Sequence, residues 1–338
     1  MAFSFFQQEL AIDLGTANTV IFVGDKKVID EPSIVAIDKQ SGKVVAVGSK
    51  AKEMQGKENL HIRTIRPMKD GVIADFDACE QMIVQFIKMI NFKRTIFSPS
   101  LRMVIGIPSG STEVEKRAVR DAAEHSGGRD MQMIYEPMAA AIGIGLDVMA
   151  ASGNMVVDIG GGTTEVAVIS LGGIVASNSI KTAGDVFTDE IQQYMRQQYN
   201  IRIGEPTAEQ IKINIGAALS ELEEPLDPYV VKGPNLVTVH PVEAHVTYQE
   251  IAHCLDKPLA KIESSILSVL EETPPELYSD IVQKGIFLTG GGALLRGLDQ
   301  RLANKMNIPF HVSEDPLRAV ARGTRIALKN PSYPFLMR

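Results

Sequence analysis

Met155-Val-Val-Asp-Ile-Gly-Gly-Gly-Thr163 decides the fold of this chain, because an earlier stretch, Leu10-Ala-Ile-Asp-Leu-Gly-Thr16, has the same construction. In each stretch an apolar run typical of a buried strand ends at an aspartate and then turns through glycine. A β-rich segment follows each turn, at 19–23 and at 165–170, as in a hairpin. Internal similarity of this kind indicates two related halves.

Strand-like and helical segments alternate in both halves, which favours an α/β fold. Apolar strands are expected at 103–107 and 284–289. A capping-box pattern at Thr112 and Glu115 opens a predicted helix over 113–125. The same pattern at Thr207 and Gln210 predicts a helix from 207 towards 224, and leucine spacing predicts another over 294–306. The stretches 24–75 and 180–250 are predicted to be insertions.

Length and composition limit the classes of protein that fit. The chain has 338 residues, 45% hydrophobic and 22% charged, which suits about two globular domains. A net charge of −7 makes a broad nucleic-acid surface unexpected. Cys79 and Cys254 lie far apart without metal-ligand spacing, as in a protein of a reducing cytoplasm. The sequence contains no uninterrupted apolar run of about 18 residues, so no membrane span is predicted.

The two glycine-rich turns predict a phosphate clamp. Glycine lets an anion approach backbone N–H groups closely, and threonine or asparagine hydroxyl and amide groups in the turns add donors. The strand-ending Asp13 and Asp158 suit hydrated Mg²⁺. The alternative is a pair of tight hairpin turns with an aspartate at each bend, and two copies at matching strand ends favour the clamp. A third cluster, Thr289-Gly-Gly-Gly-Ala293, is a weak signal alone.

These motifs, in this order, resemble those of the actin, sugar-kinase and heat-shock-chaperone superfamily of ATPases. Within it, the chain resembles the MreB family of bacterial actins from about residue 10 to Arg322. The motifs that carry the resemblance are Ala11-Ile-Asp-Leu-Gly-Thr-Ala-Asn-Thr19, Arg66-Pro-Met-Lys-Asp-Gly-Val-Ile-Ala-Asp75, Glu136-Pro-Met-Ala-Ala-Ala141, Ala183-Gly-Asp185, Glu209-Gln-Ile-Lys212 and Thr289-Gly-Gly-Gly-Ala-Leu-Leu-Arg296.

The resemblance implies an α/β actin-like ATPase fold, with two duplicated ribonuclease H-like domains, a small subdomain inserted in each, and ATP in the cleft between them. The implied subdomains are IA (1–31, 75–144 and 314–338), IB (32–74), IIA (145–180 and 250–313) and IIB (181–249). The implied ATP contacts are Gly15, Thr16, Ala17, Asn18, Gly160, Gly161, Gly162, Thr163, Glu209, Gln210, Ile211, Lys212, Gly290, Gly291, Gly292 and Ala293.

The resemblance also assigns roles to acidic residues. Asp13 and Asp158 are implied to hold Mg²⁺ through water, and Glu136 to orient the attacking water in hydrolysis. Without the resemblance, Glu136 reads as an acid at a helix N-terminus, and both roles are compatible. Glu209 and Lys212 otherwise read as a solvated ion pair. Asp185 matches a family position at the edge of the cleft without a defined role.

The function implied by the resemblance is that of an ATP-hydrolysing filament that helps set cell shape by directing cell-wall synthesis. The expected partners are further copies of the chain, the inner face of the cytoplasmic membrane and the cell-wall elongation machinery. Two alternatives remain open: a small-molecule kinase of the same superfamily, and an ATP-gated scaffold that does not polymerise. A kinase predicts turnover stimulated by one metabolite, whereas a scaffold predicts ATP binding without filaments.

Two apolar segments are candidates for membrane contact. Phe3, Phe5 and Phe6 lie in the N-terminal stretch, for which a strand extension or a disordered tail is the alternative. Ile96 and Phe97 follow a helix expected over 77–92, with ordinary core packing as the alternative. Basic residues surround the second segment and suit an acidic lipid surface, namely Lys88, Lys93, Arg94 and Arg102. Avidity along a polymer makes weak anchors sufficient.

Overall fold

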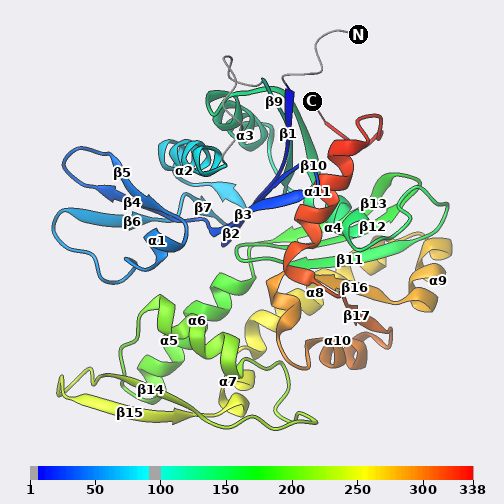
Figure 1. The fold of residues 1–338 in the computed structure, drawn as a ribbon. Helices are drawn as coiled ribbons and strands as arrows, with labels where there is room; N and C mark the ends of the chain where they lie inside the picture. The colour runs from blue at the N-terminus through cyan, green and yellow to red at the C-terminus, as the bar shows by residue number, and fades with distance from the viewer. Residues whose placement is uncertain (1–6, 91–99, 338) are drawn as a thin grey trace.

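The computed structural model describes residues 7–90 and 100–337, and its core holds two five-stranded sheets of the same construction (Figure 1). In each sheet a three-stranded antiparallel meander is extended by two parallel strands. The strands, in spatial order, are β3 (Lys26–Pro32), β2 (Asn18–Val23), β1 (Gln7–Leu14), β9 (Ser100–Ile107) and β10 (Gly128–Tyr135) in the first sheet, and β13 (Gly173–Ile180), β12 (Thr164–Ser170), β11 (Asn154–Ile159), β16 (Ile286–Thr289) and β17 (Phe310–Val312) in the second. The predicted duplication is confirmed.

The two predicted aspartates occupy equivalent places in the central strands of these sheets. Asp13 lies opposite Gly106 of the parallel neighbour β9. Asp158 lies opposite Thr289 of the parallel neighbour β16. Each aspartate is one residue from the end of its strand, directly before the turn into the second strand of the meander. The two glycine-rich turns therefore leave matching positions of the two halves.

Helices α4 (Glu136–Gly143) and α11 (Ala319–Lys329) lie between the two sheets at the centre of the molecule (Figure 1). Their backbones approach so closely that a Cβ on Gly323 would lie 1.7 Å from the carbonyl oxygen of Ala139. Apolar residues of both sheets pack into the same core as these helices, including Ala11, Val104, Val156 and Ala167. The two halves thus share one packed core beneath the turns.

Each half carries an insertion at the side of its sheet (Figure 1). The first insertion, within residues 32–74, contains a small three-stranded sheet, a one-turn helix and a short hairpin: β4 (Val35–Asp38), β5 (Val44–Val47), α1 (Ser49–Lys52), β6 (Ile62–Ile65), β7 (Met68–Lys69) and β8 (Val72–Ile73). The second insertion, within residues 181–249, contains two helices and a hairpin: α5 (Gly184–Gln198), α6 (Glu205–Ile215), β14 (Tyr229–Pro234) and β15 (Pro241–Val246). The bounds of the four subdomains stay a prediction.

The outer helices agree with the expected α/β pattern. They are α2 (Phe76–Met89), α3 (Glu113–His125), α7 (Tyr248–Cys254), α8 (Asp256–Glu272), α9 (Pro275–Lys284) and α10 (Leu298–Met306). Strand β16 begins at Ile286 rather than 284, because α9 extends to Lys284. Within the described residues no helix combines the length and the apolar character needed to cross a bilayer.

Two predicted helices are wrong in extent. The helix expected from 207 to 224 is α6, which begins at Glu205 with Pro206 in its first turn and ends before Gly216. The helix expected over 294–306 is divided, because Gly297 adopts a left-handed φ of 72° between a 3-10 turn at Gly291–Leu294 and α10. A left-handed residue cannot continue a right-handed helix.

Candidate functional site

A cavity of about 690 Å³ lies between the two halves, a size in the range of small-molecule sites, about 300–1,000 Å³. Both glycine-rich turns line it, together with the third glycine cluster and residues of both insertions. The predicted site residues that line it are Asp13, Gly15, Thr16, Ala17, Asn18, Glu136, Asp158, Gly160, Gly161, Gly162, Thr163, Glu209, Lys212, Gly290, Gly291 and Gly292. Segments from distant parts of the sequence thus meet at one site.

Side-chain and backbone hydrogen bonds fix the shape of the first turn. The hydroxyl of Ser33 donates to the carbonyl oxygen of Gly15 at 2.7 Å. The N–H of Ser33 donates to the carbonyl oxygen of Ala17 at 2.9 Å. The Thr16 hydroxyl accepts from the N–H of Gly71, in the β7–β8 hairpin, at 3.0 Å. The first insertion therefore holds this turn from outside the sheet.

The N-terminus of α5 fixes the second turn. The N–H of Gly184 donates to the carbonyl oxygen of Gly160 at 3.1 Å, and that of Asp185 donates to the carbonyl oxygen of Gly161 at 2.7 Å. The two turns also touch each other, since a Cβ on Gly161 would lie 2.7 Å from the Cβ of Ala17. Glycine at this position thus allows close approach of the two halves as well as of a ligand.

Three carboxyl groups at the base of the cavity have raised pKa values. Burial, with the charges of Asp158 and Asp30, raises the pKa of Asp13 to about 7. Burial raises the pKa of Asp158 to about 6, although the hydroxyl of Thr289 donates to its carboxylate at 2.7 Å. Burial, with the charges of Glu165, Asp13 and Asp158, raises the pKa of Glu136 well above its usual value. Ionising these groups together is costly.

This donor set fits Mg²⁺ by its chemistry. The two strand-ending carboxyl groups line the same cavity, and a bound cation would offset the cost of ionising them where they are buried. Mg²⁺ prefers one or two carboxylates together with phosphate oxygens and water. The described residues contain no group of three or more His, Cys, Asp or Glu side chains placed to hold a metal ion. The fit therefore depends on Asp13 and Asp158.

Glu136 is the first residue of α4, and Pro137 follows it in the first helical turn. The helix N-terminus favours a carboxylate, yet burial and the neighbouring acids outweigh it, because the pKa of Glu136 is raised. One of these neighbours, Glu165, was missed by the sequence analysis. It is fully buried and accepts hydrogen bonds from the N–H of Ser109 at 3.0 Å and from the hydroxyl of Ser179 at 2.5 Å.

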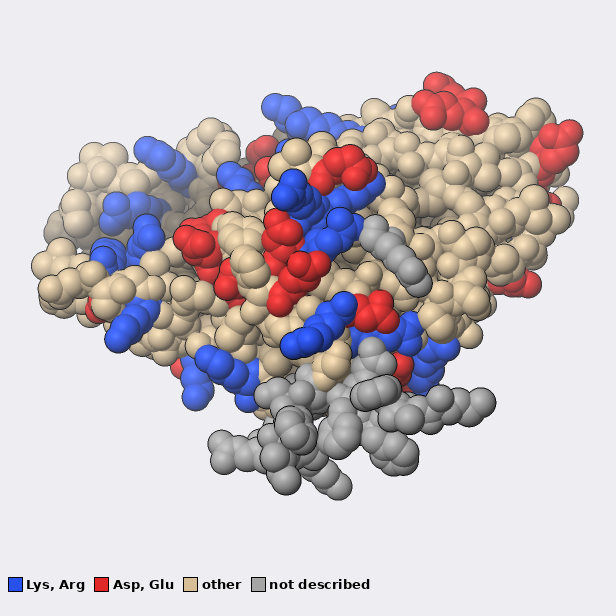
Figure 2. Space-filling model, turned by 90° about the horizontal axis from the view of Figure 1, so that it is seen from above, with Lys and Arg blue, Asp and Glu red and all other residues tan. Residues whose placement is uncertain are grey.

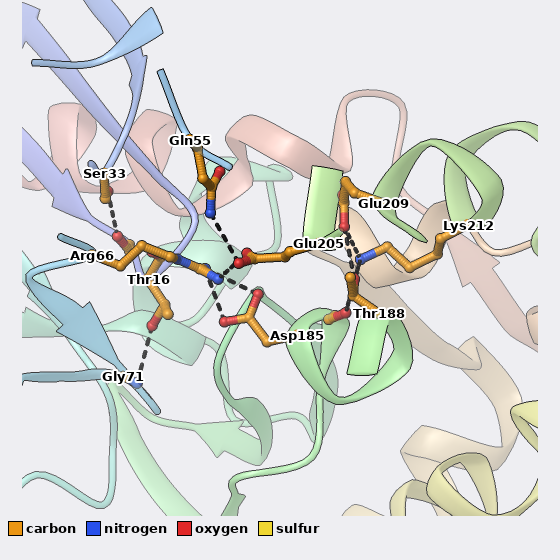
Figure 3. Close-up of polar contacts among 12 residues, drawn as sticks. Thr16, Ser33, Gln55, Arg66, Gly71, Asp185, Thr188, Glu205, Glu209 and Lys212 are labelled. Atoms are coloured by element: carbon orange, nitrogen blue, oxygen red, sulfur yellow. Dashed lines mark hydrogen bonds and ion pairs between the residues drawn. The ribbon is translucent and has the colours of Figure 1, made fainter. Parts of the chain in front are cut away.

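Glu209 and Lys212 form an ion pair of 2.6 Å on the cavity-facing side of α6. The pair also ties α6 to α5, since Lys212 donates to the carbonyl oxygen of Gly184 at 2.8 Å and Glu209 accepts from the hydroxyl of Thr188 at 2.8 Å (Figure 3). Burial acts to raise the pKa of Glu209, but Lys212 and Thr188 outweigh it and hold that pKa below its usual value. The pair is therefore half-buried and hydrogen-bonded to α5, not freely solvated.

Gln210, Ile211 and Ala293 do not line the cavity, and the ATP contacts that the resemblance implies for them stay a prediction. Ile211 is buried in the core of the second half, and Gln210 is exposed outside the cavity. Ala293 is 3% exposed within the 3-10 turn. The sequence motifs Glu209–Lys212 and Gly290–Ala293 therefore each combine cavity-lining and core positions, as the helical period requires.

The third glycine cluster has a packing reason as well as a place in the cavity. A Cβ on Gly290 would lie 2.3 Å from the carbonyl oxygen of Ile159, and one on Gly292 would lie 2.2 Å from the Ile159 side chain. Leu294 and Leu317 add exposed apolar surface to this end of the cavity. Neither leucine was predicted, because apolar residues near a glycine turn carry no distinct sequence signal.

Asp185 had no defined role from sequence, and neither Arg66 nor Glu205 was predicted as a site residue. All three line the cavity, where Arg66 forms ion pairs with both acids at 2.9 Å (Figure 3). Arg66 and Asp185 lie within motifs that carried the family resemblance. Their pairing joins positions far apart in the sequence, so no local pattern indicated it.

The predicted membrane-contact residues Phe3, Phe5, Phe6, Ile96 and Phe97 lie outside the described residues. Of the basic residues predicted to surround the second segment, Arg102 is paired. It lies 2.9 Å from Glu9 and 3.6 Å from Asp130, and its side chain is only 13% exposed. Arg102 therefore has little charge to offer a lipid surface, whereas Lys88 is exposed.

Comparison with known proteins gives one consistent result. The family model described as MreB/Mbl protein matches residues 7–334. The chain is 49% identical to the cell shape-determining protein MreB of Escherichia coli (strain K12) over 331 residues, which are 96% of this chain and 94% of that protein. It is 46% identical to the cell shape-determining protein Mbl of Bacillus subtilis (strain 168) over 326 residues, which are 96% of this chain and 97% of that protein.

The fold agrees with a solved structure of the same family. MreB 5 of Spiroplasma citri bound to AMPPNP superposes with a TM-score of 0.91 at 35% identity, covering 96% of this chain and 97% of that one. The expected actin-like α/β fold is therefore confirmed. The matched family model, the two cell shape-determining relatives and this superposition all extend over nearly the whole chain, which belongs to the MreB/Mbl family of actin-like cytoskeletal proteins.

Proposed function

We propose that the chain binds and hydrolyses ATP and assembles into actin-like filaments at the inner face of the cytoplasmic membrane, where it helps set cell shape by directing cell-wall synthesis. The observation that carries this proposal is the cavity between the halves, which two matching glycine-rich turns line from opposite sides. A triphosphate lying between them would receive backbone N–H groups from both.

In this proposal the acidic residues that line the cavity have different roles in ATP hydrolysis. Asp13 and Asp158 would hold Mg²⁺ through water, and the ion would supply positive charge for the phosphate oxygens. Glu136 orients the attacking water, since phosphoryl transfer depends mainly on positioning and charge stabilisation. The pair of Glu209 and Lys212 lies towards the ribose and base, opposite Gly290–Gly292. The AMPPNP bound by MreB 5 of Spiroplasma citri supports an adenine nucleotide as ligand.

The family and the two-halved architecture support filament formation. Head-to-tail contacts that do not close produce a polymer, and two halves around a nucleotide cleft let the nucleotide bias such contacts. Membrane contact is proposed through Ile96 and Phe97, with Phe3, Phe5 and Phe6 as a second segment. Figure 2 shows Lys and Arg interspersed with Asp and Glu on the face seen from above, so lipid attraction would depend on few charges and on avidity.

Co-sedimentation with acidic liposomes tests the membrane part of the proposal. With ATP and Mg²⁺, the wild-type protein is expected to pellet with vesicles that contain phosphatidylserine, and the double variant Ile96→Ser, Phe97→Ser is expected to remain in the supernatant while still binding ATP. The matched control is Val237→Ser, which removes a side chain that is 80% exposed in the second insertion. Equal pelleting of all three proteins would contradict this assignment.

The same preparation separates the rival functions. A kinase would show ATP turnover stimulated strongly by one metabolite, with no threshold in protein concentration. A scaffold that does not polymerise would bind ATP and give no filaments in any nucleotide or lipid condition. The proposed filament requires a threshold concentration for pelleting in the presence of ATP.

A further inference from the structure

Arg66, which lines the cavity, links the first insertion to the second (Figure 3). Its Nη2 lies 2.9 Å and 3.0 Å from the two carboxylate oxygens of Asp185, and its Nη1 lies 2.9 Å from Glu205. Gln55, also in the first insertion, donates to Glu205 at 2.9 Å. These contacts join the two insertions directly, through residues that line the cavity.

Arg66 is also connected to both glycine-rich turns. Its Nη2 reaches the carbonyl oxygen of Thr16, in the first turn, at 3.5 Å. Asp185, its acidic partner, donates its own N–H to the carbonyl oxygen of Gly161, in the second turn, at 2.7 Å. A continuous series of contacts therefore runs from one turn through Arg66 and Asp185 to the other. We call the contacts of Arg66 with Thr16, Asp185 and Glu205 the Arg66 bridge.

The surroundings make the Arg66 bridge sensitive to the separation of the two halves. The side chains of Arg66 and Asp185 are only 27% and 33% exposed. Burial raises the pKa of Asp185 even though Arg66 acts to lower it, so this carboxylate depends on its partner for compensation. The turns themselves are in contact, because a Cβ on Gly162 would lie 2.6 Å from the Thr16 hydroxyl. Opening the cleft would separate Arg66 from both acids at once.

We propose that Arg66 is a positioning residue that sets the separation of the two phosphate-binding turns by bridging Thr16 to Asp185 and Glu205 across the cavity. This inference rests on the proposed function, and it adds to that function a determinant of nucleotide state. The terminal phosphate of a triphosphate contacts both turns only when the turns lie close together. A diphosphate lacks that phosphate, so its binding depends less on the distance between the turns. The Arg66 bridge therefore favours ATP over ADP, although Arg66 itself does not take part in the reaction.

The matched control is Arg301, which also pairs with two carboxylates, Asp256 at 2.7 Å and Glu263 at 2.6 Å. All three of these residues belong to the second half, away from the cavity. Arg301→Ala therefore removes an arginine with a similar set of partners and leaves the contacts between the halves unchanged. An effect shared by both arginine variants would reflect general destabilisation.

The first measurement compares the affinities for Mg²⁺-AMPPNP and for Mg²⁺-ADP. In Arg66→Ala, AMPPNP is expected to bind about tenfold more weakly and ADP no more than about twofold, as expected for loss of a part-buried ion pair. Asp185→Asn should change the same ratio in the same direction. The double variant should show no more than the larger single effect, because both substitutions remove one interaction. Arg301→Ala should keep the wild-type ratio.

The second measurement follows cleft closure without any enzymatic readout. Spin labels on Leu60→Cys and Val237→Cys, in exposed parts of the two insertions, report the distance between the insertions by pulsed electron resonance in a Cys254→Ser background. With AMPPNP, the protein that retains Arg66 should give a short, narrow distance distribution, and Arg66→Ala a longer and broader one. Arg66→Lys, which keeps the charge, should lie between them.

The outcomes separate this inference from the proposed function. If the protein that retains Arg66 binds no adenine nucleotide, the proposed function is overturned. If it binds AMPPNP but Arg66→Ala keeps both the affinity ratio and the distance distribution, the Arg66 bridge is overturned alone. Additive effects of Arg66→Ala and Asp185→Asn would equally contradict a single shared interaction.

Discussion

Asp13→Asn is expected to stabilise the nucleotide-free protein while weakening its response to Mg²⁺-nucleotide. Folding raises the pKa of Asp13 from 3.8 to about 7, chiefly through burial. At about 1.36 kcal/mol per pKa unit, a shift of this size corresponds to about 4 kcal/mol. Asp13 keeps part of its surface open to the cavity, where water screens its charge. We therefore expect Asp13→Asn to raise the free energy of unfolding of the ligand-free protein by about 2 kcal/mol.

The sign follows from proton binding. Because the folded state binds this proton more tightly than the unfolded chain, the carboxyl group destabilises the folded protein increasingly as the pH rises from 3.8 to about 7, and by a constant amount above that. Asparagine does not ionise. The advantage of the variant should therefore be full at pH 8 and smaller at pH 6, where part of the folded protein carries a protonated Asp13.

Urea unfolding at pH 6 and pH 8, each with and without Mg²⁺-AMPPNP, measures this effect. The ligand should stabilise the wild-type protein strongly and the variant weakly, which reverses their order. Asp38→Asn is the control of opposite sign, since the N–H of Ser41 donates to Asp38 at 2.7 Å and holds its pKa below the usual value. A ligand-free Asp13→Asn protein less stable than wild type at pH 8 would refute the reasoning.

Two further predictions concern the reaction and the central helices. Glu136→Ala should retain nucleotide but slow hydrolysis by about 10²-fold or more in a phosphate-release assay, and an unchanged rate would leave Glu136 only its place at the helix N-terminus. Gly323→Ala would place its Cβ 1.7 Å from the Ala139 carbonyl oxygen, and should lower the free energy of unfolding by about 3 kcal/mol through separation of α4 and α11. Gly173→Ala, whose Cβ would meet nothing closer than 3.7 Å, should unfold at nearly the wild-type urea concentration, and equal losses in both glycine variants would argue against this packing.

Local signals predicted the elements that local interactions determine. The helix over 113–125 was predicted with correct ends because the capping box of Thr112 and Glu115 is present in the structure and Gly127 follows the helix with a left-handed φ of 103°. The duplicated strand and turn were likewise evident from sequence, since an apolar run that ends in Asp and Gly predicts a buried strand followed by a turn. These signals sufficed for the fold and for the cavity-lining turns.

Where competing signals were present, the prediction failed. Thr207 resembled a helix cap, yet Pro206 occupies the first turn of α6, where its missing N–H costs nothing, so the helix starts earlier. The Arg66 bridge was not predictable at all, because Arg66 and Asp185 are 119 residues apart and meet only through the packing of the two halves. The raised pKa values of Asp13 and Glu136 also depend on acidic neighbours from other strands.

The most direct test of the proposed function is electron cryomicroscopy of the protein incubated with Mg²⁺-AMPPNP and acidic lipid. We expect filaments in which density for the nucleotide lies between Gly15–Asn18 and Gly160–Thr163, with its terminal phosphate near Glu136. Nucleotide density outside this cavity, or monomers alone in every nucleotide and lipid condition, would contradict the proposal that this cavity is the ATP site of a filament.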